Sequence, residues 1–319
     1  MSNHMSSTEL CLVGVGPMAM DYAKVLRALK QPFTAVGRGE KAVQIFEAKT
    51  GIIARSGGVQ SFLSHLSTPP EQAIVAVGVE QLAPVTAALL EKGVRRILVE
   101  KPAGLTPGEI RDLAGLTDDR DAEVYVAYNR RFYGSVLEAK RLIAEDGGPT
   151  SFHFEFTEWS HLIEKLTDEV VKREWFLANS THVIDMAFFL GGKPKEMASF
   201  ATGSLEWHPA GARYTGAGVA SSGALFSYCA DWQAPGRWGV EIMTKKRRFI
   251  FKPLEKLQMQ LIGSVAVSEL PLPDQLDQDF KPGLYRQTEA FLKGGALGLL
   301  SISEHVSNLA IYQKMNEKR

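Results

Sequence analysis

The sequence predicts an α/β fold in which a doubly wound, parallel-sheet domain precedes an α+β domain with a large, mainly antiparallel open sheet. Two patterns support this prediction. Short apolar runs alternate with helix-like segments from Glu9 to about Ala144, whereas period-two alternation dominates after the turn-rich stretch Glu145–Thr150. Strand–helix repetition is typical of a parallel sheet with helices on both faces, and period-two strands between turns are typical of an antiparallel sheet with one covered face. The length of 319 residues also suits about two domains.

Five strand–helix pairs make up the first part of the chain. The strands are expected at 9–16, 33–38, 71–79, 95–100 and 122–129, and the helices at 17–29, 40–51, 82–93, 106–116 and 134–145. Period-two strands are expected within 151–160, 195–204, 223–232, 239–252 and 256–263, and further helices at about 172–190, 282–295 and 301–315. Residues 1–8 are expected to be disordered, 9–130 to form the first domain and 131–319 the second, with the last helix able to pack back on the first domain.

Composition and charge exclude several classes of protein. Lys plus Arg and Asp plus Glu both number 36, so the chain has no electrostatic footprint for nucleic acid or an anionic membrane. No apolar run reaches ~18 residues and the N-terminus lacks a secretory apolar core, so a cytoplasmic protein is expected. Seven histidines and two cysteines show no ligand spacing, so no metal site is expected. Cys11 and Cys229 lie in apolar runs and are interpreted as reduced core thiols.

The segment L-V-G-V-G-P-M-A-M holds the first motif with chemical meaning. Gly14, Gly16 and Ala19 form G-x-G-x-x-A between the first strand and the first helix, the fingerprint of a Rossmann dinucleotide-binding domain. The first glycine permits a tight turn, the second lets the backbone approach a pyrophosphate, and the small third residue allows close helix–strand packing. The phosphates would lie at the helix N-terminus, near Pro17 and Met18.

The end of the second strand predicts which nicotinamide cofactor binds. An acidic residue at this point would bind the ribose hydroxyls of NAD, but the sequence has Gly37 and Arg38 there. Glu40 is close by, but it is expected to open the next helix. Because an arginine can bind a 2′-phosphate through two hydrogen bonds, NADP(H) is favoured and NAD(H) is the alternative. A solvated loop arginine is the plain structural interpretation.

A third feature is the apolar run I-L-V-E-K-P, which ends in adjacent charges. Glu100, Lys101 and Pro102 follow a strand at the carboxyl edge of the predicted parallel sheet, where ligands bind in doubly wound folds. Proline restricts the residue before it, so the lysine would be held stiffly. The alternative is that the strand simply ends in solvent.

Together with the glycine fingerprint, E-K-P resembles the glucose-fructose oxidoreductase, inositol dehydrogenase and rhizopine-catabolism (Gfo/Idh/MocA) family. Further similar segments are A-Y-N-R-R-F-Y-G-S at 127–135, N-S-T-H-V-I-D-M-A-F-F-L-G-G at 179–192 and F-K-P-G-L-Y-R-Q-T-E-A-F-L-K-G-G at 280–295. These matches span most of the chain in the family's order. The resemblance implies a nicotinamide-dependent oxidoreductase that acts on sugars, cyclitols or related small polyols.

The resemblance also implies roles for individual residues. Lys101 would orient and polarise the reacting carbonyl or hydroxyl, and His182 would be the general acid/base, because hydride transfer to a carbonyl leaves an alkoxide that needs a cation and a proton donor. Glu100 would fix Lys101 or touch the cofactor ribose. A structural histidine packed at a domain junction is the alternative for His182. Further cofactor contacts are implied for Val77, Gly78, Lys101, Asn129, Arg130 and Trp175, and substrate contacts for Tyr128, Trp159, His161, Asn179 and His182.

Two departures from the family pattern leave the reaction open. Sugar-active members commonly read D-x-G-x-H at the helix motif, but this sequence has Ala178 and Ser180 before His182. The proline and histidine that often follow the fourth strand are replaced by Gly78 and Leu82. Three hypotheses follow: an NADP(H)-dependent sugar or nucleotide-sugar dehydrogenase or reductase, a same-fold reductase of a non-sugar acceptor, and a non-catalytic NADP-binding regulator.

The second sheet predicts self-association. Its outer face is expected to carry G-A-L-F-S-Y-C-A-D-W and F-I-F-K-P, which would expose enough apolar surface for a second copy. Family members commonly pair through this sheet, so the resemblance implies a homodimer or a homotetramer. A small-molecule substrate is the other expected partner.

Overall fold

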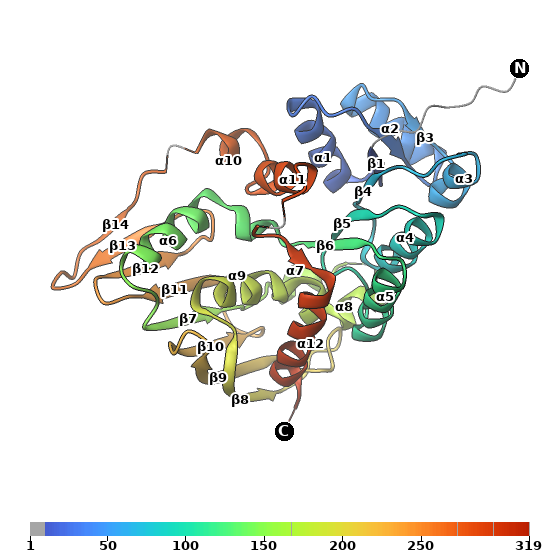
Figure 1. Cartoon of the computed structure of the whole chain (residues 1–319). Coiled ribbons are helices and arrows are strands. Elements are labelled where there is room, and N and C mark those ends of the chain that lie inside the picture. Colours follow the sequence, from blue (N-terminus) through green and yellow to red (C-terminus); the bar gives the residue numbers. More distant parts are fainter. Residues whose placement is uncertain (1–9, 167, 273, 296, 319) are drawn as a thin grey trace, which may run out of the picture. The chain divides into compact units, whose positions relative to one another are not determined.

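The computed structural model describes residues 10–166, 168–272, 274–295 and 297–318 (Figure 1). Residues 1–8, for which the sequence predicts disorder, lie outside the described residues. The described chain forms two compact units. The first unit comprises the described parts of Met1–Tyr128 and Leu284–Ser307, and the second those of Asn129–Gly283 and Asn308–Arg319.

A seven-stranded sheet forms the centre of the first unit, in the order β15-β6-β5-β4-β1-β2-β3. Its strands are β1 (Leu10–Val13), β2 (Thr34–Val36), β3 (Ala54–Arg55), β4 (Gln72–Val75), β5 (Arg96–Glu100), β6 (Glu123–Ala127) and β15 (Leu300–Ser301). The first six strands are parallel, and β15 joins β6 antiparallel. The order 3-2-1-4-5-6 is that of dinucleotide-binding domains. The predicted Rossmann fold is therefore confirmed.

Helices cover both faces of this sheet. They are α1 (Pro17–Ala28), α2 (Glu40–Thr50), α3 (Gly58–Ser64), α4 (Val79–Lys92), α5 (Pro107–Asp119) and α11 (Leu284–Leu292). Helix α1 packs against α2 and α11, while α4 packs against α3 and α5. Local sequence explains their ends. Thr106 caps α5 by accepting a hydrogen bond from the Glu109 N–H, and Gly51 and Gly93 end α2 and α4 in the left-handed conformation that glycine adopts easily.

The second unit contains an eight-stranded sheet in the order β14-β13-β12-β11-β7-β10-β9-β8. Its strands are β7 (Ser151–Glu155), β8 (Pro194–Thr202), β9 (Arg213–Ala220), β10 (Leu225–Asp231), β11 (Gly239–Met243), β12 (Arg247–Phe251), β13 (Gln258–Leu261) and β14 (Val267–Glu269). All neighbouring pairs are antiparallel except β7 and β10, which are parallel. The large, mainly antiparallel sheet expected for the second part of the chain is confirmed.

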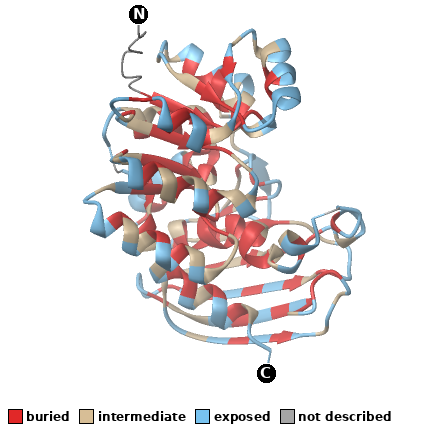
Figure 2. Ribbon diagram, turned by 90° about the vertical axis from the view of Figure 1, so that its right-hand side faces the viewer, coloured by how far each residue is buried: buried red, intermediate tan, exposed pale blue. Residues whose placement is uncertain are grey.

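One face of this sheet packs against helix α9 (Thr181–Gly191), and Figure 2 shows buried and exposed residues alternating along its strands. Phe188 of α9 lies edge-on to Phe154 and Phe226, with ring centroids 5.4 Å apart in both pairs. The other short helical segments of this unit are η1 (Asn129–Phe132), α6 (Gly134–Glu145), α7 (Ser160–Ile163), α8 (Glu169–Arg173), the π-helical turn η2 (Phe176–Ser180) and α10 (Gln275–Asp279). Helix α12 (Ile302–Asn316) begins in the first unit and ends in the second.

Two expectations about this sheet need correction. Most large side chains of the two segments expected on its outer face, among them Phe226 and Phe249, are buried, and Leu225 is the large apolar residue of β10 that stays exposed. Cys229, expected in the core, is exposed, because its position in the alternation places it beside Ser227 rather than beside the buried aromatic residues. Cys11 is buried as expected, and both thiols are free.

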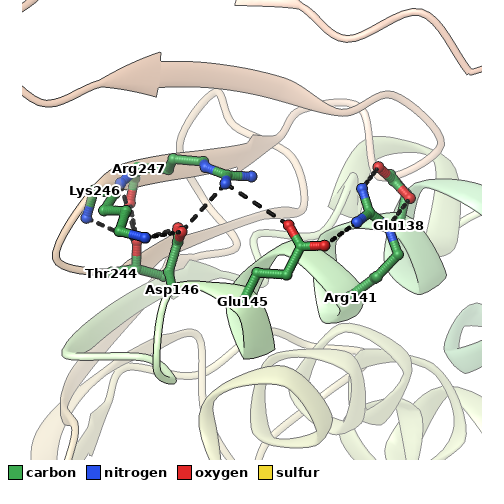
Figure 3. A network of polar contacts seen from close by, with 7 residues as sticks. All are labelled: Glu138, Arg141, Glu145, Asp146, Thr244, Lys246 and Arg247. Carbon is green, nitrogen blue, oxygen red and sulfur yellow. Dashed lines mark hydrogen bonds and ion pairs between the residues drawn. The ribbon is translucent and has the colours of Figure 1, made fainter.

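A polar network ties helix α6 to the hairpin of β11 and β12 (Figure 3). Asp146, just after the helix, is buried, accepts a hydrogen bond from the Thr244 hydroxyl at 2.8 Å and lies 3.2 Å from a nitrogen of Arg247. Arg141 pairs with Glu138 and Glu145 on the helix surface, where ion pairs contribute little to stability. The buried Asp146 is therefore the member of this network that fixes the hairpin. No helix in the described parts of the chain is both long and apolar enough to cross a membrane.

Candidate active site

The loop between β1 and α1 has the geometry that the glycine fingerprint requires. Gly14 has φ +129°, and a Cβ atom there would lie 2.1 Å from the carbonyl oxygen of Ala76. A Cβ atom on Gly16 would meet no atom within 4 Å. Ala19 is fully buried and lies 3.5 Å from the Cβ position of Gly14. The first glycine therefore makes the turn, the second leaves its side of the backbone open, and the third position allows close packing.

The N-terminus of α1 is built to receive an anion. Gly16 occupies the N-cap position without a capping side chain, and Pro17 follows as the first helical residue. The early N–H groups of a helix and its dipole favour a phosphate at this point. At the end of the neighbouring strand β4, Gly78 caps α4 and Val77 is half-buried. These residues suit the pyrophosphate of a dinucleotide, so the loop fits the predicted cofactor.

The end of strand β2 presents arginines where a carboxylate would bind a ribose. Arg38 is exposed directly after Gly37, and Arg55 is exposed at the end of the adjacent strand β3. The N–H of Gly37 donates to the Arg55 carbonyl at 2.8 Å, which fixes the two strand ends side by side. A Cβ atom on Gly37 would lie 2.7 Å from Val43, so glycine is required there. Glu40 opens α2 as expected. Sequence reasoning missed Arg55 because its two-residue strand has no periodic pattern.

Glu100 and its neighbours form a tight turn at the end of β5. The Tyr22 hydroxyl donates to Glu100 Oε1 at 2.8 Å, and the Ala103 N–H donates to the Glu100 carbonyl at 3.0 Å. Burial raises the pKa of Tyr22 well above its ordinary value, and the charge of Glu100 raises it further. The peptide bond between Lys101 and Pro102 is cis. Tyr22 of helix α1 therefore holds the carboxylate in place, so the strand does not simply run out into solvent.

A buried histidine supports the same turn from the C-terminal part of the first unit. His305 lies in α12, and its Nε2 is 3.0 Å from the Pro102 carbonyl oxygen. Its ring is 5.6 Å from that of Tyr128, which is also buried. Sequence reasoning selected Tyr128 as a substrate contact and gave His305 no role. No local pattern could have paired residues this far apart in the chain.

The second unit opens with residues from the N-R-R-F segment. The side-chain amide of Asn129 donates to the Pro282 carbonyl at 2.9 Å, so this predicted cofactor contact also holds the backbone of its own unit. Arg131 and Asp185 form a buried, two-pronged ion pair with N···O distances of 2.8 and 2.7 Å. Arg130 places its guanidinium 4.8 Å from the ring centroid of Trp238. Both arginines lie over aromatic rings, Arg131 at 4.9 Å from the centroid of Phe189, but of the two only Arg131 has a buried two-pronged ion pair among the described residues.

His182 lies in the first turn of α9 and is buried. Its ring centroid is 6.3 Å from that of Trp238. Ala178, which replaces the family's aspartate, falls in the π-helical turn η2 rather than in a regular helix. Such turns change the direction of the following side chains and are frequent at functional sites. The helix expected at about 172–190 is therefore interrupted just before the histidine.

A buried carboxylate that sequence reasoning did not select lies beside this turn. Glu158 accepts hydrogen bonds from the Ser180 hydroxyl at 2.7 Å and from the Asn179 amide at 3.1 and 3.3 Å. Arg237 donates to its other side at 3.1 Å. Burial raises the pKa of Glu158 although these donors act to lower it. Glu158 thus supplies a carboxyl group next to the segment in which the family's aspartate is missing.

The sequence did contain a signal for Glu158. Phe152, Phe154 and Phe156 are buried at even positions of the β7 region, and Glu158 continues that parity. A carboxylate at a core position needs specific partners, which marks it as a residue of interest.

Tryptophans surround Arg237 in the same unit. Its guanidinium lies 4.5 Å from the ring centroid of Trp159 and 4.3 Å from that of Trp238. The indole N–H of Trp159 donates to the Gly236 carbonyl at 3.1 Å. His161 is exposed, with its ring 6.5 Å from that of Trp159.

The predicted residues fall into two groups. In the first unit, the carboxyl edge of the parallel sheet brings together Gly14, Gly16, Gly37, Arg38, Val77, Gly78, Glu100 and Lys101. In the second unit, Arg130, Trp159, Asn179 and His182 are linked through Glu158, Arg237 and Trp238. Trp175 lies 6.4 Å from Trp207, ring to ring. Leu82, at the position of the family's histidine, is fully buried in α4 and belongs to the core.

Comparisons with known proteins support the fold. No protein-family model and no curated protein matches the sequence. A levoglucosan dehydrogenase in complex with NADH and L-sorbose is similar in structure with a TM-score of 0.76 and 18% identity, over 98% of this chain and 96% of that one. UDP-N-acetylglucosamine 3-dehydrogenase GnnA from Acidithiobacillus ferrooxidans gives 0.71 and 15%, over 98% and 97%.

An oxidoreductase from Agrobacterium radiobacter, in complex with NAD+, L-tartaric acid and magnesium, is similar with a TM-score of 0.73 and 14% identity, over 97% of this chain and 95% of that one. All three likenesses extend over nearly the whole of both chains. They confirm the two-part fold that the family resemblance implies.

Proposed function

We propose that this protein is a nicotinamide-dependent oxidoreductase of the Gfo/Idh/MocA type that transfers a hydride to or from a sugar, a nucleotide sugar or a related polyol. The observation that carries the proposal is the β1–α1 loop, where Gly14 makes the turn and the open side of Gly16 admits a pyrophosphate. The chains of similar fold support the substrate class, since two of them are named as dehydrogenases of levoglucosan and of UDP-N-acetylglucosamine.

The preferred cofactor in this proposal is NADP(H). Arg38 and Arg55 place two exposed guanidinium groups at adjacent strand ends, where a 2′-phosphate would lie in this fold. A carboxylate at the end of β2, which would repel that phosphate, is replaced by Gly37 and Arg38. Structures of similar fold that contain NADH or NAD+ keep NAD(H) as the alternative.

In this proposal, a bound nicotinamide supplies the centre that accepts or donates the hydride. The ammonium of Lys101 stabilises the negative charge that develops on the substrate oxygen. The imidazole of His182 takes the proton from the hydroxyl or returns it to the alkoxide, a role for which a ring nitrogen that can both accept and donate a proton is suited. Glu100, held by Tyr22, anchors the end of β5 directly before Lys101.

Two other functions are kept open by Ala178. A same-fold reductase of a non-sugar acceptor would need no aspartate in the turn before His182. A non-catalytic NADP-binding regulator would need neither that aspartate nor His182. Glu158 favours the enzymatic alternatives, because it places a carboxyl group against Asn179 and Ser180 in that turn.

Turnover of a substrate panel tests the proposal. Purified protein is assayed with NADP+ and NAD+ against sugars, nucleotide sugars and polyols, and with NADPH against the corresponding ketones. Lys101→Met and His182→Ala should each lower kcat by about 100-fold or more, and His182→Ala should leave nucleotide affinity within about twofold. Lys256→Met, which removes an exposed lysine paired with Glu269, is the matched control and should turn over like the wild type. Full turnover by both active-site variants would refute the assigned roles, and nucleotide binding without any turnover would favour the regulator.

A further inference from the structure

We propose that Arg237 binds an oxyanion of the substrate, either a carboxylate or a phosphate. The inference rests on the proposed oxidoreductase function and narrows its substrate class from sugars in general to sugars that carry a negative charge.

Arg237 is held in place yet remains accessible. Its guanidinium lies over the rings of both Trp159 and Trp238, at 4.5 and 4.3 Å from their centroids. Trp159 is itself fixed by its hydrogen bond to Gly236. The Arg237 side chain is nonetheless 39% exposed. A guanidinium fixed in this way loses little side-chain entropy when it binds a ligand.

Arg237 keeps hydrogen-bond donors that its partners among the described residues do not use. Glu158 engages one terminal nitrogen, Nη1, of Arg237. A guanidinium has five N–H donors in a planar fork that matches a carboxylate or a phosphate. A structural arginine that only neutralised Glu158 would gain nothing from exposure, because the carboxylate lies on the buried side of the pair. The remaining donors therefore suit an oxyanion that arrives from solvent.

The charges beside Trp238 also bear on an anionic ligand. Arg130 lies over Trp238 as Arg237 does, so two guanidinium groups share one indole ring, and the carboxylates of Glu158 and Glu255 act on Arg130. Burial lowers the pKa of Arg130, and the charge of Arg237 acts in the same direction, although Tyr133, Glu255 and Glu158 oppose it. A bound anion would relieve this repulsion.

Unpartnered donors in the same cluster also indicate a ligand rich in oxygen. The buried Nε of Arg130 and the buried indole nitrogen of Trp238 find no hydrogen-bond acceptor among the residues that the structure describes. Buried N–H groups are nearly always paired in folded proteins, so these two donors are able to take an acceptor from a bound ligand. The hydroxyl and anionic oxygens of a charged sugar are acceptors of this kind.

The position of the cluster connects it to the proposed chemistry. Trp238 lies under the guanidinium of Arg237, and its ring centroid is 6.3 Å from that of His182. An anionic group anchored at Arg237 would therefore hold the rest of a sugar within reach of the histidine. This arrangement would make Arg237 a residue that determines substrate specificity.

Isothermal titration calorimetry tests the inference with three probes: UDP for the phosphate, D-glucuronate for the carboxylate, and D-glucose as the neutral control. Each probe is titrated with and without NADPH into the wild type, Arg237→Gln and Arg248→Gln. Arg248 is a matched control because it is an arginine on strand β12 paired with Glu241. We expect at least one anion to bind the wild type about tenfold or more tighter than glucose, and Arg237→Gln alone to abolish that difference.

The two anions identify the source of the oxyanion, since preference for UDP indicates a phosphate and preference for glucuronate a carboxylate. Arg237→Gln leaves Glu158 buried without its cation, so folding could fail. The double variant Glu158→Gln/Arg237→Gln removes both charges and should also lose the preference for anions. Anion binding no tighter than glucose binding, or anion binding unchanged in either Arg237 variant, would overturn the inference. Failure of the proposed function is distinguishable from failure of this inference, because in that case the wild type binds no nicotinamide nucleotide.

Discussion

Replacing Gly14 and Gly16 separately by alanine should show that Gly14 of the nucleotide loop is needed for stability and Gly16 for nucleotide binding. In Gly14→Ala, the new Cβ would lie 2.1 Å from the Ala76 carbonyl oxygen, about 1 Å closer than packed atoms approach. Ala76 cannot move away easily, because its N–H is bonded to the Val13 carbonyl at 2.8 Å. The backbone strain at φ +129° adds a further cost.

The size of the effect on stability follows from these two terms. A left-handed backbone conformation costs a non-glycine residue about 1–3 kcal/mol, and overpacking costs a similar amount. Gly14→Ala should therefore lower the free energy of unfolding by about 2–6 kcal/mol, a large part of the ~5–15 kcal/mol that a typical domain has. Gly16→Ala meets no atom within 4 Å, so its unfolding free energy should stay within about 0.5 kcal/mol of the wild type.

Nucleotide binding should show a different pattern. A methyl group on Gly16 would occupy the open side of the backbone that a pyrophosphate approaches, so the Kd for NADPH should rise about tenfold or more. Gly115→Ala is the control, because Gly115 lies exposed in helix α5 with no atom near its Cβ position. It should keep wild-type affinity and gain about 0.5–1 kcal/mol of stability.

Urea unfolding followed by circular dichroism measures the stability of all four proteins, and NADPH titration measures their affinity. Tryptophan fluorescence is unsuited to the unfolding experiment, since all five tryptophans lie between residues 159 and 238, in the second unit. Wild-type stability in Gly14→Ala would refute the argument from the turn. Wild-type NADPH affinity in Gly16→Ala would refute the placement of the pyrophosphate.

Three further outcomes are expected. Asp185→Ala should lower the free energy of unfolding in urea by about 3–5 kcal/mol, because Arg131 is left as a buried, unpaired charge. The double variant Arg131→Met/Asp185→Leu should lose clearly less, and equal losses in the two variants would contradict this. Burial raises the pKa of the Glu158 carboxyl above its ordinary 4.5. The native state therefore binds the carboxyl proton more tightly than the unfolded chain does. As the pH rises through the native pKa, loss of that proton lowers the stability of the protein. The stability of Glu158→Gln relative to the wild type should therefore be greater at about pH 8 than at about pH 4, and a reversed order in unfolding free energy would show that burial is not the dominant cause. We also propose that copies of the protein pair through the open face of the second sheet, where Leu225 is 62% exposed. In sedimentation velocity, Leu225→Asp should have a smaller sedimentation coefficient than the dimeric or tetrameric wild type, and a monomeric wild type would contradict the proposal.

Local sequence predicted the parts of the fold that local physics determines. The glycine fingerprint specified Gly14 as a turn and Gly16 as an open position, and the structure agrees at both. These requirements depend on a few consecutive residues. The E-K-P turn was located for the same reason, although its partners Tyr22 and His305 come from distant parts of the chain.

The structural elements that were missed depend on neighbours that the sequence does not place. Strand β9 reads R-Y-T-G-A-G-V-A, and its glycines and alanines have weak β-propensity. The structure explains the glycines. A Cβ atom on Gly216 would lie 2.4 Å from Tyr228, and one on Gly218 would lie 2.0 Å from the Glu196 carbonyl oxygen and 2.8 Å from Phe226. Both the aromatic residues of β10 and the backbone of β8 therefore need glycine opposite them, and only the pairing of β9 with these two strands reveals this.

The candidate site was predicted in the same uneven way. His182 and Lys101 were identified by motif, but Glu158 was overlooked because its importance comes from Ser180 and Arg237, which are far from it in sequence. The π-helical turn before His182 was also beyond periodicity, since the segment reads as a continuous helix.

A titration of the protein with NADPH and NADH tests the central claim most directly. Wild type and Arg38→Ala are titrated with each nucleotide, and the fluorescence of the bound nucleotide gives the Kd. We expect the wild type to bind NADPH more tightly than NADH. Arg38→Ala should weaken NADPH binding about tenfold or more, while NADH binding should change less than about twofold. A wild type that prefers NADH would keep the fold and contradict the role of Arg38, and a wild type that binds neither nucleotide would contradict the proposed function as a whole.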